Sequence, residues 1–549
     1  MCGIFFYRGV NDMNYNKLSQ SFNSIKHRGP DDFHVDYKIY PSNSIELNNF
    51  IGFHRLSIND VSNSGNQPFE SKNATMICNG EIYNFKSLID KYSLNCKSSS
   101  DCEVIIHMYE KIGFYETVKA LDGVFAIVLI DKNTGVVHCA RDPIGVRSMY
   151  LYNEDDGILV TSELKAIVNL ELDNTKINQF KPGNIWNSVS GYLEYFNVKT
   201  HQDNLKSTNF KIVRSDDARK TEIKNNIVNI LTNSIRKRLI SDRPIGCLLS
   251  GGLDSSLVAA ILCKLLKEID INAPKLKTFS VGLIGSPDLK YARDVADYIG
   301  SDHHELVLTE SEMIAGLEPT IFQLETYDTT TIRAGTPMYL LAKHIKSNFD
   351  TTVIFSGEGS DELSGSYMYF HNAPSPEEFQ TEIYRLVDDL HYFDVLRCDK
   401  SIAGAGLEVR VPFFDINFLK YYISINAVDK MPQNHTDNKP IEKYLLRSSF
   451  DNGLLPDSVL WRQKEGMSDG VSSEKNSWGS IIKKHVSNMK LDQMAQKYEF
   501  NEPVLLESIY YRNIFNKYFP NCEKTIPYYW LPKWSGNVID PSARVLDVY

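Results

Sequence analysis

The stretch "LLSGGLDSSLVAA" (248–260) decides how the second part of this chain folds. Apolar residues lead into a serine and two glycines, and a helix is predicted to begin near Asp254. Glycine lets backbone N–H groups approach an anion, and a helix N-terminus adds unpaired donors and a positive dipole end. Ser250, Ser255 and Ser256 add hydroxyl donors, and Asp254 suits Mg²⁺. The stretch predicts a phosphate-binding loop, although it lacks the lysine of the G-x-x-x-x-G-K-[ST] loop. The alternative is a plain strand-to-helix turn with Ser and Asp as N-caps.

The residues around this loop alternate between strand and helix patterns. An amphipathic helix is predicted over 223–239, strands over 245–249, 276–283 and 303–309, and helices over 257–269 and 291–299. Such alternation indicates a parallel sheet with crossover connections. Residues beyond about 365 are predicted to be mainly helical.

A second loop, "TTVIFSGEGSDELSGSY" (351–367), repeats the design of the first. Ser356 and Gly357 end an apolar strand and are followed by Glu358, Asp361 and Glu362. Ligands bind at the carboxyl edge of open parallel sheets, so two such loops suit a nucleoside triphosphate with magnesium. A single acidic loop would more often be a solvated turn.

The first 200 residues carry a different pattern. Apolar segments at 124–131, 135–141, 148–152 and 157–162 predict short strands at roughly ten-residue spacing, typical of antiparallel sheets packed on one another. A helix is predicted over 102–113. The chain becomes polar over 197–220, so we predict two domains, 2–205 and 215–549.

Composition narrows the class of protein. The chain has 549 residues and a net charge of −10, which argues against a broad nucleic-acid-binding surface. Its nine cysteines include no C-x-x-C pair, so neither a zinc site nor a disulfide framework is indicated. The longest apolar runs are seven residues, against about 20 for a membrane helix, and no secretory signal is visible. We expect a cytoplasmic protein with free thiols that does not span a membrane.

The opening "MCGIFFYRG" (1–9) places a thiol directly behind the initiator methionine. Removal of Met1 would leave Cys2 with a free α-amine on the same residue as its thiol. Chain termini usually tolerate change, so this thiol is either incidental or depends on being terminal.

These motifs together resemble a known family. "SGGLDSS" is similar to the signature of ATP pyrophosphatases, which cleave ATP to AMP and pyrophosphate while adenylating a substrate. The ordered set resembles the glutamine-hydrolysing asparagine synthetases over nearly the whole chain. Its further members are "MCGIF" (1–5), "HRGPD" (27–31), "FHRLSIND" (53–60), "CNGEIYN" (78–84), "LDGVFA" (121–126), "ARDPIGVR" (140–147), "ETYDTTTIRAGTPMY" (325–339), "SGEGSDE" (356–362), "GLEVRVPF" (406–413), "WRQKEGMSDG" (461–470) and "DPSARVL" (540–546). Gln463, Gly466 and Phe414 depart from the family pattern without removing a group of known chemical role.

For the N-terminal half, the resemblance implies an N-terminal-nucleophile αββα sandwich that acts as a class II glutaminase. Cys2 would be the nucleophile and its α-amine, near pKa 7.7–8.0 unperturbed, the base. The remaining implied roles are the Asn79 amide and Gly80 N–H as the oxyanion hole, Arg55 for the substrate carboxylate, Glu81 and Asp101 for its ammonium, and Leu56, Ser57, Ile58 and Asn59 as pocket lining. Surface ion pairs are the alternative for the three charged residues.

For the C-terminal half, the resemblance implies a PP-loop α/β domain with a helical C-terminal part. The implied ATP-binding residues are Leu248, Ser250, Gly251, Gly252, Asp254, Ser255, Val281, Ser356, Gly357 and Lys464. Asp254 and Asp361 would hold Mg²⁺, and Glu358 would act on the β-aspartyl-AMP intermediate. Thr330, Thr331 and Arg333 resemble the aspartate-binding segment. Ammonia is protonated in water, so the resemblance also implies an internal passage between the two sites.

The predicted reaction is ATP-dependent synthesis of asparagine from aspartate and glutamine. The expected partners are these small molecules, with no nucleic acid and no membrane, and a homodimer is left open. Three alternatives remain at this point. The chain could amidate another carboxylate, as a β-lactam-forming relative does, or it could modify RNA, which would require a basic surface. It could also be a catalytically silent member of the family.

Overall fold

The computed structural model describes residues 1–9, 14–42, 45–155, 157–200, 217–435, 439–473, 475–489 and 498–546. Its N-terminal half contains two stacked six-stranded antiparallel sheets. In spatial order the first sheet is β10 (Asn178–Gln179), β8 (Tyr150–Glu154), β9 (Gly157–Thr161), β1 (Gly3–Gly9), β3 (Ile45–Arg55) and β2 (Asp32–Ser42). The second is β12 (Gly191–Glu194), β11 (Asn184–Asn187), β7 (Val137–Arg141), β6 (Gly123–Asp131), β5 (Ala74–Ile82) and β4 (Phe69–Glu70).

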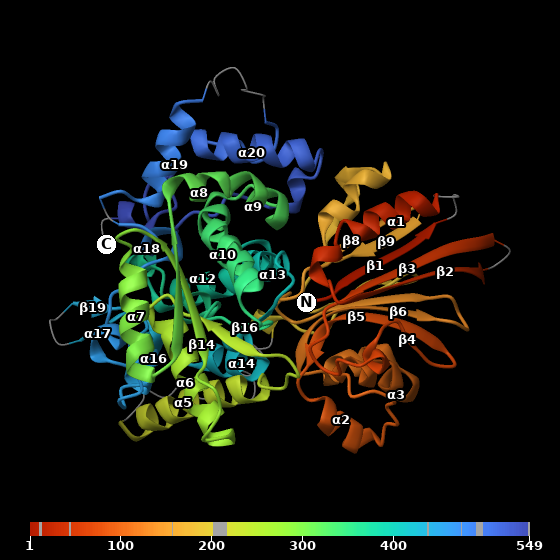
Figure 1. Cartoon of the computed structure of the whole chain (residues 1–549), viewed down its shortest axis with the longest axis horizontal. Helices are drawn as coiled ribbons and strands as arrows, with labels where there is room; N and C mark the ends of the chain where they lie inside the picture. The colour runs from red at the N-terminus through yellow and green to blue at the C-terminus, as the bar shows by residue number, and fades with distance from the viewer. Residues whose placement is uncertain are drawn as a thin grey trace.

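Helices cover the outer faces of both sheets. Helix α1 (Tyr15–Asn23) lies on the first sheet, while α2 (Phe85–Tyr92) and α3 (Val104–Ala120) lie on the second (Figure 1). The four layers form an αββα sandwich, which confirms the predicted fold. The helix predicted at 102–113 is the first part of α3, and Gly113 kinks the helix with a φ of 76°.

The sequence of strand β6 is continuously apolar because both of its faces are buried. Alternate side chains of a strand point to opposite faces. Phe125, Ile127 and Leu129 pack among the side chains of α2 and α3, whereas Ala126, Val128 and Ile130 pack between the two sheets. Both faces of the strand are therefore buried, and no polar alternation is left.

The C-terminal half is built on a five-stranded parallel sheet. Its order is β15 (Asp302–Leu308), β14 (Lys277–Leu283), β13 (Ile245–Leu248), β16 (Val353–Phe355) and β17 (Glu408–Arg410). Helices α6 (Leu253–Ile269) and α7 (Pro287–Ile299) pack against β13 and β14, and α10 (Thr329–Asn348) and α13 (Asp394–Ala403) pack against β14 and β17. Helix α5 (Asp217–Lys237) precedes the sheet and packs on α6. The predicted alternation is confirmed.

The region beyond 365 is mostly helical, as predicted, but it also supplies strand β17. This strand has three residues, too few for a sequence period, and its pairing with β16 sets it in the sheet. The other elements of this half are α8 (Glu310–Ala315), α9 (Leu317–Leu324), α11 (Ser360–Ser364), α12 (Pro376–Asp389), α14 (Ile416–Ser424), α15 (Ala427–Lys430), β18 (Gln433–Asn434), β19 (Pro440–Ile441), α16 (Tyr444–Ser449), α17 (Asp457–Leu460), α18 (Met467–Gly470), α19 (Trp478–Ser487) and α20 (Leu506–Tyr518).

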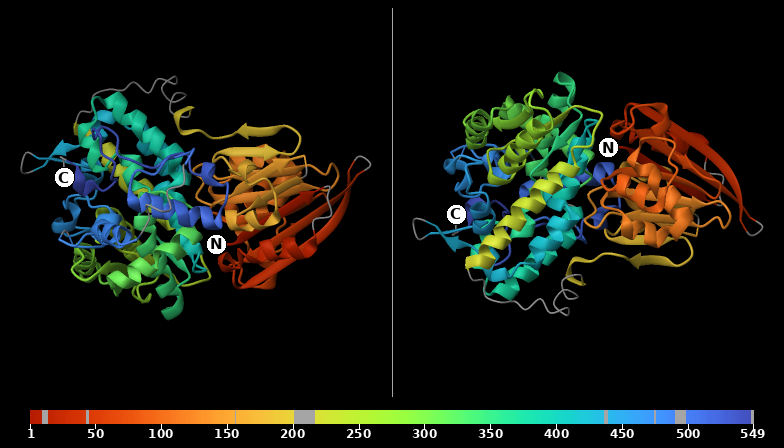
Figure 2. Two further views of the ribbon diagram at one scale, coloured as in Figure 1. Left: turned by 90° about the horizontal axis from the view of Figure 1, so that it is seen from above. Right: turned by 90° about the horizontal axis from the view of Figure 1, so that it is seen from below.

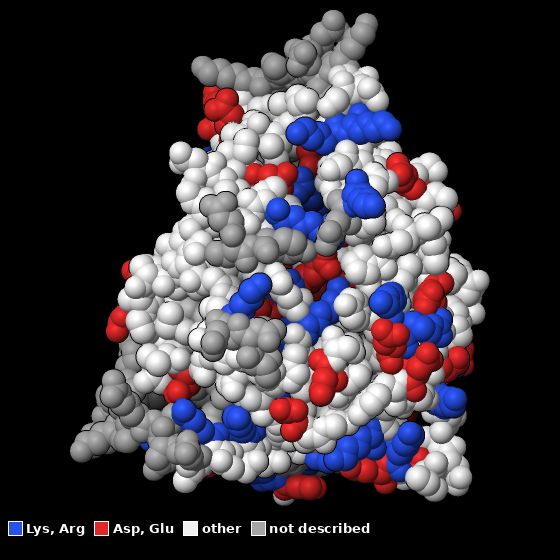
Figure 3. Space-filling model, turned by 90° about the vertical axis from the view of Figure 1, so that its left-hand side faces the viewer, with Lys and Arg blue, Asp and Glu red and all other residues white. Residues whose placement is uncertain are grey.

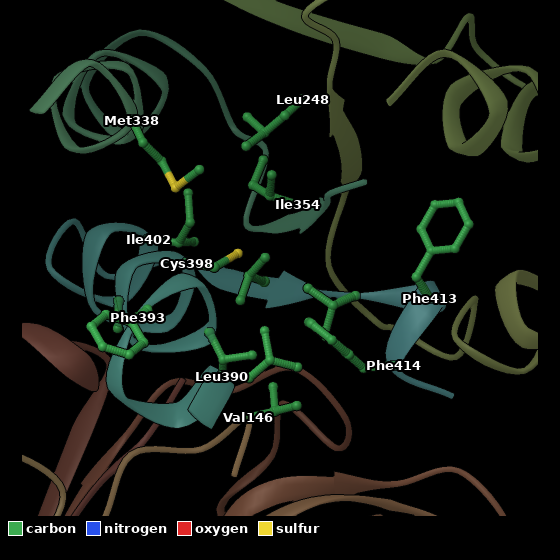
Figure 4. Packing of buried hydrophobic residues seen from close by; sticks show 14 of the residues in the cluster. Val146, Leu248, Met338, Ile354, Leu390, Phe393, Cys398, Ile402, Phe413 and Phe414 are labelled. Carbon is green, nitrogen blue, oxygen red and sulfur yellow. The ribbon is translucent and has the colours of Figure 1, made fainter. Parts of the chain in front are cut away.

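The two halves share one apolar core. Val146 of the N-terminal half packs with Leu390 of the C-terminal half in a single cluster of buried side chains (Figure 4). The N-terminus lies at this junction, where Met1 is buried (Figures 1 and 2). The predicted domain ends at 205 and 215 fall within 201–216, outside the described residues, and stay predictions.

Buried ion pairs also join the halves. Arg28 bonds Glu163 at 2.9 Å within its own half and Asp399 of α13 at 3.0 Å across the junction. Lys400 of α13 contacts Glu325 at 2.5 Å and the Tyr150 hydroxyl at 2.7 Å. The Arg28–Asp399 pair spans the junction, so removing either partner would leave a buried charge unpaired, at a cost of about 3–5 kcal/mol.

All nine cysteines are free thiols, as predicted. None of the described helices combines the length and apolarity needed to cross a membrane.

Candidate active sites

The first candidate site is a pocket around Cys2, which directly precedes β1. Most of the residues predicted to bind glutamine meet here. The pocket is lined by Cys2, Phe53, Arg55, Leu56, Ile58, Asn59, Gly65, Gln67, Cys78, Asn79, Gly80, Glu81, Ser100, Asp101, Cys102 and Glu408. Ser57 is not among them, because its N–H donates to the Asp31 carboxylate at 2.9 Å, outside the pocket.

The Cys2 thiol lies against backbone groups of Leu56. Its Sγ is 3.4 Å from the Leu56 N–H and 3.7 Å from the Leu56 carbonyl. Burial raises the pKa of this thiol to about 11, so little thiolate forms at neutral pH while Met1 is attached. Burial also lowers the pKa of the Met1 amine to about 6, and this amine lies 3.3 Å from the Leu407 carbonyl.

Asn79 contributes an amide that makes no hydrogen bond to the part of the chain that the structure describes. The side chain is completely buried, yet neither its Nδ2 nor its Oδ1 has a hydrogen-bond partner among the described residues. Buried amides in native proteins nearly always form hydrogen bonds. Its place at the pocket wall therefore points to a bound molecule as the missing partner. Gly80 beside it passes close to β6, and a Cβ there would lie 2.5 Å from the Val124 carbonyl oxygen.

Neutral acceptors hold Arg55 in the pocket. Its guanidinium donates to the Ser62 carbonyl at 2.7 Å, to the Asn66 amide oxygen at 2.5 Å and to the Asp60 carbonyl. These acceptors fix the orientation of the guanidinium without neutralising its charge. Arg55 can therefore pair with an entering carboxylate.

Two buried carboxyl groups, those of Glu81 and Asp101, line the same pocket. The Asn59 amide donates to Glu81 at 2.6 Å and to Asp101 at 3.1 Å. Burial raises the pKa of both groups, and the carboxylate of Glu408 raises that of Glu81 further. One pocket is thus lined by a cation and two acidic groups, the charge types that bind the carboxylate and ammonium of a free amino acid.

Glu408 and Arg410 reach this pocket region from β17 of the other half. Arg410 pairs with Glu408 at 2.9 Å and with Glu81 at 3.4 Å. The sequence indicated no role for either residue, although both lie in the quoted motif "GLEVRVPF". Only the pairing of β17 with β16 carries them here.

The second candidate site is a cleft at the carboxyl edge of the parallel sheet. The predicted ATP-binding residues Leu248, Ser250, Gly252, Asp254, Ser255, Val281, Ser356, Gly357 and Lys464 line it, together with Thr330, Glu358 and Asp361. Gly251 is not a lining residue. Its backbone adopts a left-handed φ of 71°, and its carbonyl accepts a hydrogen bond from the Arg462 guanidinium at 3.2 Å. Both features set the conformation of the loop.

Hydroxyl groups brace the first loop. The Ser255 hydroxyl accepts from the Ser250 N–H at 3.1 Å and lies 3.0 Å from the Ser250 hydroxyl. The second loop crosses directly over the start of α6, since a Cβ on Gly357 would lie 2.6 Å from the Ser255 nitrogen. The two glycine loops therefore meet at one helix N-terminus, a closer approach than their predicted place on strands of one sheet required.

Two lysines face the acidic residues of the cleft. Lys443 contacts Asp254 and Asp361 at 2.5 Å each, and Lys464 contacts Asp361. Burial alone would raise the pKa of Asp361, but the two lysines hold it well below its usual range. Burial alone would lower the pKa of Lys464, but the Asp361 carboxylate raises it.

Lys443 was not predicted as a site residue from the sequence. Its side chain is almost fully buried, and its backbone adopts a left-handed φ of 57°. Such strain in a non-glycine residue clusters at functional sites. The only available signal was a lysine in a polar stretch, which is common on protein surfaces.

Glu358 lies in the same cleft, held by Arg397 of α13 at 2.8 Å. Arg397 also bonds Asp394 at 2.6 Å. Burial raises the pKa of Glu358. Helix α13 therefore contacts both sides of this region. Arg397 bonds Glu358 in the cleft, and Asp399 and Lys400 bond residues of the N-terminal half.

The three residues predicted to bind aspartate occupy different positions relative to the cleft. Thr330 lines the cleft and an adjoining pocket, and its buried hydroxyl has no partner among the described residues. Thr331 lines the adjoining pocket and bonds Asp328 at the start of α10. Arg333 lines neither, because its guanidinium pairs with Glu507 at 2.6 Å and Asp540 at 2.8 Å.

The face that carries the C-terminal half shows mixed charge. In Figure 3, basic and acidic side chains are interspersed, and both signs meet in a hollow near the middle of the face. This face therefore lacks the uniform basic surface that an RNA-modifying enzyme would present.

Family models match both halves of the chain. The model described as asparagine synthase matches residues 226–378 and 372–535, and that described as glutamine amidotransferase domain matches residues 1–206. A solved structure of glutamine phosphoribosylpyrophosphate amidotransferase from B. subtilis matches with a TM-score of 0.31 and 13% identity, covering 56% of this chain and 81% of that one.

Curated relatives match along the full length. Asparagine synthetase [glutamine-hydrolyzing] from Gallus gallus is 44% identical over 579 residues, covering 100% of this chain and 99% of the relative. The protein of the same name from Homo sapiens is 42% identical over 578 residues with the same coverage. With both family models and full-length relatives in agreement, this chain belongs to the glutamine-hydrolysing asparagine synthetase family.

Proposed function

We propose that this chain makes asparagine from aspartate with ammonia released from glutamine, cleaving ATP to AMP and pyrophosphate. The supporting observation is that one chain holds two pockets of different chemistry joined by a single core. One contains a thiol, an unpartnered amide and opposed charges, and the other contains two glycine loops that converge on a helix N-terminus. Glutamine hydrolysis is assigned to 2–205 and the synthetase reaction to 215–549.

In the first reaction, Cys2 acts after Met1 is removed. The thiol transfers its proton to the α-amine, and the sulfur attacks the side-chain carbonyl carbon of glutamine. The α-ammonium returns this proton to the amide nitrogen as the carbon–nitrogen bond breaks, which releases ammonia, and water then hydrolyses the thioester to glutamate and the free thiol.

The pocket residues position glutamine for this attack. The Asn79 amide and the Gly80 N–H are assigned to the developing oxyanion, which would give the buried Asn79 donor its partner. Arg55 is assigned to the α-carboxylate, and Glu81 and Asp101 to the α-ammonium. Leu56, Ile58 and Asn59 are assigned to the walls, and Ser57 is not, because it does not line the pocket.

In the second reaction, ATP occupies the cleft. Leu248 and Val281 are assigned to the adenosine, and the phosphates to the hydroxyl and backbone donors of Ser250, Gly251, Gly252 and Ser255, with Ser356 and Gly357 beside them. Lys464 and Lys443 supply positive charge to the leaving pyrophosphate. Both lysines now contact carboxylates, so the phosphates would compete for them.

Asp254 and Asp361 fit a magnesium ion bound with the nucleotide. The Asp254 Oδ1 is buried without a hydrogen-bond partner among the described residues, and carboxylate oxygens are the hard ligands that Mg²⁺ prefers. When bound, the ion would neutralise phosphate charge.

Glu358 and Thr330 complete the aspartate end of the cleft. Glu358 is assigned to the formation of β-aspartyl-AMP and its attack by ammonia, with Arg397 fixing its carboxyl group. Thr330 and Thr331 remain candidates for aspartate binding. Arg333 forms ion pairs with Glu507 and Asp540, and it would have to give up those partners to contact the substrate.

The test supplies purified chain with aspartate, ATP, Mg²⁺ and glutamine, and measures asparagine, AMP and pyrophosphate. All three should form in equal amounts. Accumulation of ADP and phosphate would reject adenylation. Pyrophosphate release only with a carboxylate other than aspartate would favour the alternative substrate class, and no turnover would favour a silent member. We also infer a cytoplasmic protein with small-molecule partners, and a homodimer remains open.

A further inference from the structure

A second cluster of reactive side chains lies in the N-terminal half, outside both sites. It consists of Cys96, in the loop after α2, Glu103, which ends the short 3₁₀ helix Asp101–Glu103, and His107 of α3. One ligand atom from each residue, a sulfur, a carboxylate oxygen and an imidazole nitrogen, lies within 4.8 Å of the other two. The reaction proposed above uses none of the three.

Helical spacing brings two of these groups together. Glu103 and His107 are four residues apart, so they share one face, and the His107 Nε2 lies 3.2 Å from the Glu103 Oε1. Paired metal ligands on helices use the same spacing. The preceding loop then adds the Cys96 thiol from the side.

Backbone groups already orient the carboxylate. The Lys97 N–H donates to Glu103 Oε1 at 2.8 Å, and the Ser98 N–H donates to Oε2 at 2.7 Å. Outer hydrogen bonds of this kind orient the ligands of protein metal sites. The side chains of Glu103 and His107 are 7% and 23% exposed, so an ion and a water molecule can reach the cluster.

We propose that Cys96, Glu103 and His107 bind one divalent ion of the Zn²⁺ class, with water as the fourth ligand. A thiolate, an imidazole and a carboxylate match the borderline-soft preference of Zn²⁺, whereas Mg²⁺ and Ca²⁺ prefer oxygen alone. On binding, the Cys96 S–H proton leaves to solvent as the sulfur–metal bond forms. The Glu103–His107 hydrogen bond is exchanged for two bonds to the ion.

The ion would stiffen one wall of the Cys2 pocket. Ser100 and Asp101, which line that pocket, lie between Cys96 and Glu103 in the chain. An ion bound by Cys96, Glu103 and His107 would therefore hold the chain both before and after Ser100 and Asp101.

The test titrates Co²⁺, a spectroscopic substitute for Zn²⁺, into the full chain carrying Cys2→Ala. That background removes the terminal cysteine, which could itself chelate metal. We expect one Co²⁺ per chain with a thiolate-to-cobalt charge-transfer band. Cys96→Ser should abolish the band, and His107→Ala should weaken binding at least as much as the ~10–100-fold typical of losing an outer-shell partner.

Cys263→Ser and His344→Ala are matched controls, because neither residue belongs to the cluster. Both should bind Co²⁺ like the background protein. A band that survives Cys96→Ser, or the absence of stoichiometric binding by the background protein, would overturn the proposal. As a second measurement that needs no variant of the cluster, Zn²⁺ should slow hydrogen exchange over residues 96–107, and unchanged exchange there would equally overturn it.

Discussion

Replacing Asn79 by alanine should preserve or raise the stability of the protein while lowering its rate of glutamine hydrolysis. The Asn79 side chain is fully buried, and both polar atoms lack partners, so the folded enzyme without substrate bears the cost of an unpaired amide. An unsatisfied buried polar group costs about 1–3 kcal/mol. Asn79→Ala removes that cost and loses little apolar contact, so we expect the N-terminal half to become no less stable and up to ~1–2 kcal/mol more stable.

The same change should cripple glutamine hydrolysis. If the Asn79 amide donates to the oxyanion, its loss should lower the rate by about 10²–10³, as for other single donors of this kind. Asparagine formation from ammonium salt should be unaffected, because the cleft of the C-terminal half is intact. We would measure glutamate release, asparagine from each nitrogen source and urea unfolding of the substrate-free enzyme.

Gln67 offers a matched control, because it is a second buried amide in the same pocket whose hydrogen bonds are satisfied. Its Oε1 accepts from the Cys78 N–H at 2.6 Å, and its Nε2 donates to the Cys78 carbonyl at 3.0 Å. Gln67→Ala strands both groups and should destabilise the protein by roughly 2 kcal/mol or more. If Asn79→Ala is as destabilising as Gln67→Ala, or hydrolyses glutamine within tenfold of the parent, the oxyanion assignment is refuted.

Four further outcomes are expected. With Met1 retained by an uncleavable tag, both glutamine-dependent reactions should be lost while ammonia-dependent synthesis persists, and a fully active tagged enzyme would refute the terminal-amine mechanism. In that tagged protein, Cys2 alkylation should rise about tenfold per pH unit between pH 8 and 10, because burial raises the folded-state thiol pKa to about 11 and thiolate forms only as pH increases; a plateau near pH 8 would contradict this, and Cys2→Ala gives the background rate. Asp254→Asn should abolish asparagine synthesis from either nitrogen source but leave glutamine hydrolysis intact. Pyrophosphate release at the rate of the parent protein would exclude Asp254 from the ATP site. Glu358→Gln should collapse asparagine formation while the protein still folds, because Asp394 continues to pair with Arg397, and normal output would exclude Glu358 from the catalytic set.

The sequence alone was sufficient for the layout of both halves. Strand and helix periods follow from which side chains must be buried, so the alternation around "LLSGGLDSSLVAA" predicted the parallel sheet, and the short apolar segments at 124–162 predicted antiparallel sheets. Gly251 was predicted to let backbone N–H groups approach an anion, and the structure adds a different reason for glycine there, a left-handed φ and a close neighbouring backbone. These features are local, and local pattern encodes them.

The sites depended more on contacts between residues far apart in sequence. The predicted ATP-binding loops do meet, since strands of one parallel sheet end at one edge. Lys443, however, reaches Asp254 across 189 positions, and nothing in its neighbours distinguishes it from a surface lysine. Arg333 likewise looked like a substrate ligand until the fold placed two carboxylates against it.

Strand β17 shows the limit most clearly. Three residues carry no period, so a sequence pattern cannot place "EVR" (408–410) in a sheet, and only hydrogen bonding to β16 does so. That pairing brings Glu408 to the Cys2 pocket and Arg410 to Glu81. Local composition thus determined which elements form and which chemistry each half carries. Only the tertiary structure decided which charges face one another, because ion pairing depends on distance in space rather than on distance along the chain.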